Sequence, residues 1–259
     1  MTIRTCPGCS AAVDGPYCPA CGQRQPQPGD FGLRHLAGEA WEEVSNTDSR
    51  LWRTLGGIFR PGLLTRAWLD YRWQQYFPPL RLYLLLSGVY FLLAWDVTFQ
   101  INVDQVRALP EGAMPAPVRE VYLDDAAANL VGDLTALFKF ASVLVMGLWV
   151  ALLHLGNRAP IGAHMVYALH YTVFDFAVYS LLTLVIALVP AADRLAVFTA
   201  TLPLGMFLLF LWASLASRRV YGRSWPGSLV RGAAVAAMDF VLSVVSGQLA
   251  VVVVILTRM

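Results

Sequence analysis

Four cysteines near the start of the chain form the strongest chemical signal in the sequence. They occur as two Cys-x-x-Cys pairs, Cys6 with Cys9 and Cys18 with Cys21, and the chain has four cysteines in total. Two such pairs supply four thiolates, which Zn²⁺ binds tetrahedrally with no position left for water. We therefore predict a structural zinc ribbon over residues 1–25, with one Zn²⁺ per chain. A redox dithiol is the alternative, but it needs a βαβ surround that this segment lacks.

A second set of chemistry-bearing residues lies inside long apolar stretches. At 100° per residue, His164, Tyr171 and Asp175 share one side of a helix, whereas His170 points away from it. Asp239 lies in another apolar stretch, about as far from the cytoplasmic end of that stretch as Asp175 lies from the cytoplasmic end of its own. Ionisable groups within a membrane are costly and therefore indicate a functional site. The candidate intramembrane polar site comprises His154, His164, His170, Tyr171, Asp175 and Asp239.

This polar set has three possible roles. The histidines and aspartates could bind a transition metal, or they could pass protons through the membrane. They could equally form structural hydrogen bonds between helices. The sequence has no closely spaced ligand pair of the His-x-x-x-His kind, which disfavours a metal centre.

The elements that must position these residues are membrane helices. Of 259 residues, 57% are apolar and 14% charged, and the mean hydropathy is +0.56. These values exclude an ordinary soluble domain and, with 12% aromatic residues, a disordered chain. We predict an all-α integral membrane protein, a bundle of five spans at residues 80–99, 134–155, 165–189, 195–216 and 229–256.

The distribution of arginines predicts the orientation of the bundle. Eight arginines precede the first span, and four more lie around the connection between the fourth and fifth. Cytoplasmic loops carry such an excess, so we expect a cytoplasmic N-terminus and, after five spans, an extracytoplasmic C-terminus. The cysteines also favour a cytoplasmic N-terminus, because the cytoplasm keeps thiols reduced for metal binding. Residues 1–30 have no apolar signal-peptide core.

Residues 26–79 are predicted to form interfacial amphipathic helices. Between Ser49 and Phe59 apolar residues recur at helical spacing, and arginines lie between them. A weaker pattern runs from Leu33 to Val44, and Pro61-Gly62 should separate the second helix from a third that carries Trp68, Tyr71 and Arg72. These helices either contact lipid or pack beneath the bundle. The predicted membrane-surface residues are Arg50, Trp52, Arg53 and Arg60.

Several segments resemble an uncharacterised family of bacterial inner-membrane proteins with an N-terminal zinc ribbon, domain of unknown function family 3667. The similarity lies in the two Cys-Pro-x-Cys pairs and, further along the chain, in residues 48–55, 60–62, 78–83, 163–170 and 219–222. The resemblance implies a bacterial inner (cytoplasmic) membrane location and supplies no activity.

The sequence shows no catalytic constellation, P-loop or dinucleotide fingerprint, so we expect no enzymatic activity. Residues 1–30 carry Arg4 and Arg24 against Asp14 and Asp30, which gives no basic face for nucleic acid. Our first hypothesis is a non-enzymatic adaptor or envelope assembly factor that contacts the lipid bilayer and a protein partner at the cytoplasmic face. The second is a small transporter or proton-linked channel that uses His164, Asp175 and Asp239. A metal-dependent enzyme that uses the three histidines is third.

Overall fold

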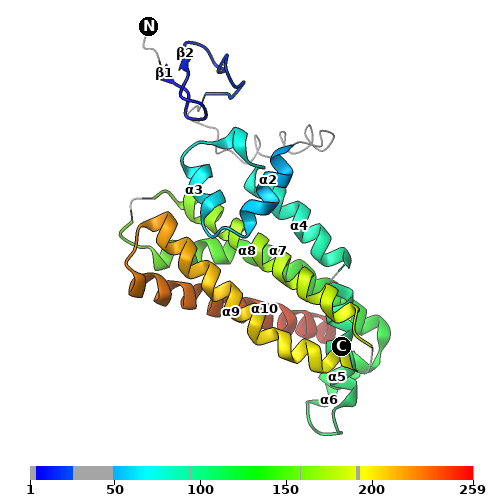
Figure 1. Ribbon diagram of the computed structural model, residues 1–259. Helices are drawn as coiled ribbons and strands as arrows, with labels where there is room; N and C mark the ends of the chain where they lie inside the picture. Colours follow the sequence, from blue (N-terminus) through cyan, green and yellow to red (C-terminus); the bar gives the residue numbers. More distant parts are fainter. Residues whose placement is uncertain (1–3, 26–48, 94, 158, 191–192, 259) are drawn as a thin grey trace.

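The computed structural model describes residues 4–25, 49–93, 95–157, 159–190 and 193–258. Among these residues, four helices are long and apolar enough to cross a membrane: α7 (Asp125–Leu153), α8 (Ile161–Ala187), α9 (Arg194–Tyr221) and α10 (Trp225–Arg258). They run side by side along the length of the molecule (Figure 1). The prediction of a helical membrane protein is therefore confirmed.

Helix α8 is the central helix of the bundle. It packs against α7, α9 and α4 (Pro79–Leu93), and about 61% of its most apolar window is buried, against 22–33% in the other three long helices. Tyr167 and Phe176, on α8, are at most 1% exposed, whereas Leu144 on α7 and Phe240 on α10 are more than half exposed. The polar residues of α8 therefore face protein, while α7, α9 and α10 present apolar surface outward.

The first predicted span, residues 80–99, coincides with two described helices, α4 (Pro79–Leu93) and α5 (Trp95–Ala108). Residue 94 between them lies outside the described residues, so this span stays a prediction. At about 1.5 Å per residue, the 15 residues of α4 cover roughly 22 Å, less than the hydrocarbon thickness of about 30 Å. The sequence of α5 contains the polar residues Gln100, Asn102 and Asp104.

Two ends of the bundle can be distinguished in Figure 1. At the far end, α5 and α6 (Ala116–Leu123) lie beside the C-terminus, and Arg258 pairs with Asp124 at 2.9 Å. At the near end lie the N-terminal segment, α2 (Ser49–Ile58) and α3 (Leu63–Leu69). The two chain termini therefore lie at opposite ends.

Helices α2 and α3 form a short hairpin against the near half of the bundle. Gly62 has a φ of 72° and begins α3, so the predicted break at Pro61-Gly62 is confirmed. Two hydrogen bonds fix the turn to α9: Arg219 Nη1 donates to Pro61 O at 3.0 Å, and Trp212 Nε1 donates to Ile58 O at 2.9 Å. The third predicted helix is shorter than expected, because α3 ends at Leu69 before Tyr71 and Arg72; a 3-10 turn, η1 (Trp73–Gln75), follows.

The outward surface of α2 combines aromatic and basic side chains. Thr54 and Ile58 face the bundle and are buried, whereas Trp52 is 71% exposed and Phe59 53% exposed. The sequence pattern placed Trp52 on the same side as the buried apolar residues. In the structure Trp52 instead lies outward with Arg53. The weaker helix predicted from Leu33 to Val44 lies outside the described residues.

Candidate functional site

The four cysteines converge into one cluster at the near end. Their sulfur atoms all lie within 4.8 Å of one another, with Cys6 Sγ 3.6 Å from Cys21 Sγ and Cys9 Sγ 3.5 Å from Cys18 Sγ. Among the described residues, this is the group whose ligand atoms lie close enough to hold a metal ion. Cys6 and Cys18 are buried, whereas Cys9 is exposed. The cluster can bind a metal ion through four sulfur donors.

The two Cys-x-x-Cys turns have equivalent backbone geometry. In the first, Cys6 N–H donates to Ala11 O and Ser10 N–H donates to Cys6 O, each at 2.8 Å. In the second, Cys18 N–H donates to Gln23 O and Gly22 N–H donates to Cys18 O, also at 2.8 Å. Ser10 and Gly22 are left-handed, with φ of 61° and 70°. Each turn thus presents its two sulfurs in the same way.

The backbone around the first turn also favours a thiolate. Burial raises the pKa of the Cys6 thiol, but hydrogen bonds from the backbone of Cys9 and Gly8 and from the side chains of Cys21 and Cys18 together lower it to about 7. Because the thiolate is the metal-binding form, this backbone prepares Cys6 for a metal ion. The strands β1 (Arg4–Thr5) and β2 (Ala12–Val13) pair antiparallel and close the turn.

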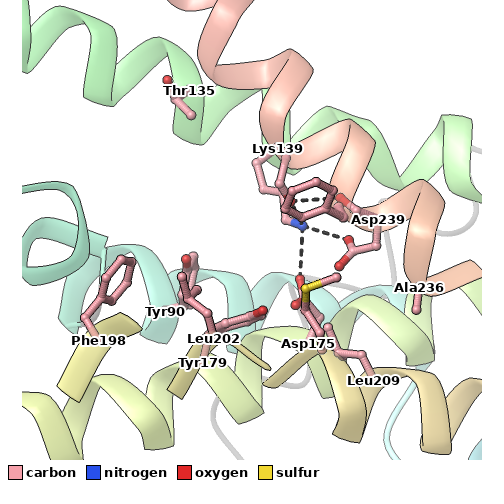
Figure 2. Close-up of a pocket in the computed structure, with 13 residues that line it drawn as sticks. Tyr90, Thr135, Lys139, Asp175, Tyr179, Phe198, Leu202, Leu209, Ala236 and Asp239 are labelled. Atoms are coloured by element: carbon pink, nitrogen blue, oxygen red, sulfur yellow. Dashed lines mark hydrogen bonds and ion pairs between the residues drawn. The ribbon is translucent and has the colours of Figure 1, made fainter. Parts of the chain in front are cut away.

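The middle of the bundle contains a buried group of charges, which we call the charged triad: Lys139 on α7, Asp175 on α8 and Asp239 on α10. Lys139 Nζ lies 2.8 Å from Asp239 Oδ1 and 3.2 Å from Asp175 Oδ2 (Figure 2). It also donates to Ser243 Oγ at 2.8 Å. The three charged residues are 8%, 1% and 7% exposed. Asp175 and Asp239, predicted to lie at equal depth, therefore meet around one ammonium group.

The helix register explains why these residues meet. Lys139 lies fourteen residues before Leu153, and Asp175 and Asp239 lie fourteen residues after Ile161 and Trp225. Each side chain is therefore about 21 Å from the near end of its helix. Sequence analysis omitted Lys139, although a lysine within the predicted span 134–155 is a costly residue that signals a buried partner.

The charged triad does not balance its own charge. Two carboxylates surround one ammonium, so the ionised group carries one surplus negative charge. Asp175 Oδ1 is buried and has no hydrogen-bond partner among the described residues. An unpaired charge in a low-dielectric interior is unfavourable, and one bound proton or monovalent cation would neutralise it.

A cavity of about 200 Å³ adjoins the charged triad on the side of the far end. Its wall includes Tyr90 of α4, Tyr179 of α8 and Phe198, which lies in the first turns of α9 (Figure 2). Lys139, Asp175 and Asp239 also line it. The charged groups are thus accessible to a small solute that enters this space.

The three candidate histidines do not converge on one site. His154 stacks on Tyr221 with ring centroids 3.7 Å apart, and His164 Nδ1 lies 2.9 Å from Tyr221 Oη at the near end of the bundle. His170 Nδ1 instead lies 3.0 Å from Thr65 Oγ1 on α3. Burial lowers the pKa of His154, which follows the end of α7, to about 4, so this ring is neutral at pH 7. His164 is not part of the charged triad.

Comparison with known proteins finds similarity to one family model and no activity. The family model described as "Protein of unknown function (DUF3667)" matches residues 48–91, from the start of α2 through most of α4, and confirms the resemblance to this uncharacterised family. No curated protein and no solved structure matches the chain.

Proposed function

We propose that this protein is a small transporter or proton-linked channel in which the charged triad binds the transported or coupling cation. The observation that supports this role is the arrangement of Asp175, Asp239 and Lys139: two carboxylates and one ammonium, buried at mid-bundle beside a cavity. Intramembrane charges are retained where they serve a pathway or a proton relay.

Polar contacts that only hold helices together do not require buried charges. Neutral hydrogen bonds such as that from Trp149 Nε1 to Ala234 O already join α7 to α10. A buried ion pair adds little stability over apolar residues of similar volume. The third charge adds a repulsion between carboxylates that binding of a proton or monovalent cation would remove, and this favours a functional site over a structural one.

The proposed orientation places the near end in the cytoplasm, where the arginines of the connection between α9 and α10 also lie. Helices α4 and α5 would together complete a fifth crossing, in agreement with termini at opposite ends of the bundle. The cysteine cluster would hold one Zn²⁺, because four sulfur donors match its preferred ligand set. Such a closed site would act as a structural cross-link.

The test is proton flux into liposomes that contain the purified full-length protein, driven by a potassium–valinomycin potential and followed with an enclosed pH dye. We expect flux above empty liposomes, and Asp175→Asn should reduce it by roughly 100-fold, the lower range for a positioned proton-transfer group. Asp133→Asn, an exposed acidic residue of α7, is the matched control and should conduct normally. Wild-type flux equal to that of empty liposomes would contradict the proposal.

An adaptor role is the second candidate, supported by the exposed surface of the cysteine segment. Tyr17 is 61% exposed and Cys9 is exposed, so this segment offers surface for a protein partner. Replacing both Cys18 and Cys21 by Ser should then remove a protein that co-purifies from cross-linked membranes, whereas Asp175→Asn should retain it. The reverse pattern would contradict the adaptor role.

A further inference from the structure

We propose that protons reach Asp175 from the near end along one side of α8, through His164, Tyr167 and Tyr171. This inference rests on the proposed function of the charged triad and adds the route that supplies it. In this proposal, the cavity connects Asp175 toward the far end, and the polar side chains of α8 connect it to the near end. The far half of the pathway is therefore a cavity, and the near half is a row of polar side chains.

The first observation is the spacing of these residues. They follow one another at intervals of three, four and four residues, which places them on one side of the helix. His164 is 4% exposed, Tyr167 and Tyr171 are 0% exposed, and Asp175 is 1% exposed. From His164 to Asp175 the distance along the axis is about 16 Å, so the four groups cover most of the near half of α8.

The near part of the route is hydrogen-bonded to α9. His164 Nδ1 lies 2.9 Å from Tyr221 Oη, and Tyr167 Oη lies 3.2 Å from Ser217 Oγ while donating to Ala213 O at 2.9 Å. A hydroxyl both donates and accepts a hydrogen bond, and it can rotate to exchange partners. Within each of these two hydrogen-bonded sets, His164 with Tyr221 and Tyr167 with Ser217, a proton can therefore be exchanged by rearranging the hydrogen bonds.

The inner part of the route contains two unsatisfied polar atoms on the same side of α8. Tyr171 Oη and Asp175 Oδ1 are buried, one helical turn apart, and neither has a hydrogen-bond partner among the described residues. His154 Nε2, on the ring that stacks against Tyr221, is a third such atom at the near end. Buried polar atoms are normally satisfied, and ordered water commonly provides the bonds. Water at these positions would connect the protein groups into a continuous file.

The transfer conserves atoms and charge. His164 takes a proton from the aqueous phase at one ring nitrogen and releases a proton from the other. Each hydroxyl or water accepts a proton on its near side and gives one up on its far side. Asp175 gains the last proton, which neutralises the surplus charge of the triad. The charged or titratable groups that face this route are His154 at the end of α7, Tyr221 on α9, and Lys139 and Asp239 of the triad.

The test uses the same flux assay on Tyr171→Phe, which keeps the ring and its contact with Trp212 but removes the hydroxyl. We expect proton flux to fall by roughly 100-fold. The matched control is Tyr83→Phe, a buried tyrosine on α4 whose hydroxyl donates to the backbone Phe140 O and is not one of the groups on the α8 route. The control should conduct at the wild-type rate.

A second variant separates proton transfer from packing. His164→Ala should reduce flux, and imidazole added on the near side should restore it, because a free base can replace a proton carrier but not a structural contact. Wild-type flux in both Tyr171→Phe and His164→Ala, with Asp175→Asn inactive, would overturn the route and leave the proposed function intact. An absence of flux in the wild-type protein would overturn both.

Discussion

The cysteine cluster and the charged triad are built in opposite ways. The four sulfurs come from sixteen consecutive residues, and two equivalent turns place them. The triad joins three helices across 100 residues of sequence, from Lys139 to Asp239. The first site needs correct local backbone geometry, and the second needs the correct rotation and depth of three helices.

The two sites also differ in what stabilises them. A segment as small as residues 4–25 has little core of its own, so a bound metal would provide most of its folding free energy. The triad costs free energy in the membrane interior, and packing of the surrounding helices must compensate. Damage to one site should therefore leave the other intact, and the predictions below test this independence.

The largest effect is expected from metal removal. Structural zinc sites contribute about 10–16 kcal/mol to the folding of small domains at pH 7, so a strong chelator should unfold the cysteine segment. The unfolding temperature of the bundle should stay the same, because the hydrogen bond from Gln23 Nε2 to Tyr71 O at 2.9 Å is a limited link between the two regions. Elemental analysis and protection of the four thiols from alkylation would measure the first effect, and thermal unfolding in detergent the second. A large fall in bundle stability would contradict the independence of the sites.

The next effect concerns the cation of the triad. Lys139→Met leaves two carboxylates buried without their partner, which should lower the free energy of unfolding by about 3–5 kcal/mol. The triple variant with Asp175→Asn and Asp239→Asn should recover most of this loss, since no charge then remains. It should still show no proton flux. Equal stability of wild type and Lys139→Met would contradict the buried charge pairing.

A smaller effect should follow from the two left-handed residues of the cysteine turns. Ser10→Gly removes the strain of a side chain at positive φ, worth about 1 kcal/mol, and Gly22→Ala introduces a similar strain. Metal affinity, measured by competition with a chelator, should rise by about fivefold in the first variant and fall by about fivefold in the second. Opposite signs are the decisive result. Both positions are left-handed, and one variant removes a side chain there while the other adds one.

The smallest effect should come from an exposed ion pair at the far end. The Arg258 guanidinium, with the backbone N–H groups of Ala127 and Ala126, holds the pKa of Asp124 below its usual range. A depressed carboxyl pKa stabilises the fold above the unfolded pKa, and this contribution is lost as pH falls through the folded pKa. Asp124→Asn should therefore reduce the unfolding temperature slightly at pH 7, and this reduction should shrink as the pH falls through the folded pKa. Because both side chains are more than 40% exposed, the effect should be much weaker than that of Lys139→Met.

Sequence reasoning was most successful where the relevant interactions are local. The cysteine spacing predicted the cluster of four sulfurs that could hold a metal ion, and the periodicity between Ser49 and Phe59 predicted α2. The span predicted at residues 80–99 stays a prediction, because residue 94 between α4 and α5 lies outside the described residues. Lys139 was not among the predicted site residues, because the partners of a buried lysine depend on the relative rotation and depth of the helices.

The sequence by itself determined that this chain is a membrane-helical protein, that four cysteines gather near its start, and that α8 carries a polar side. These properties follow from composition, from spacing within a turn, and from the 100° rotation per helical residue. Only the tertiary structure decided that Asp175 and Asp239 share Lys139, and which partners His164 and His170 have, Tyr221 and Thr65 respectively. The physical reason is that contacts between helices depend on their relative rotation and depth, which the packing of the whole bundle determines.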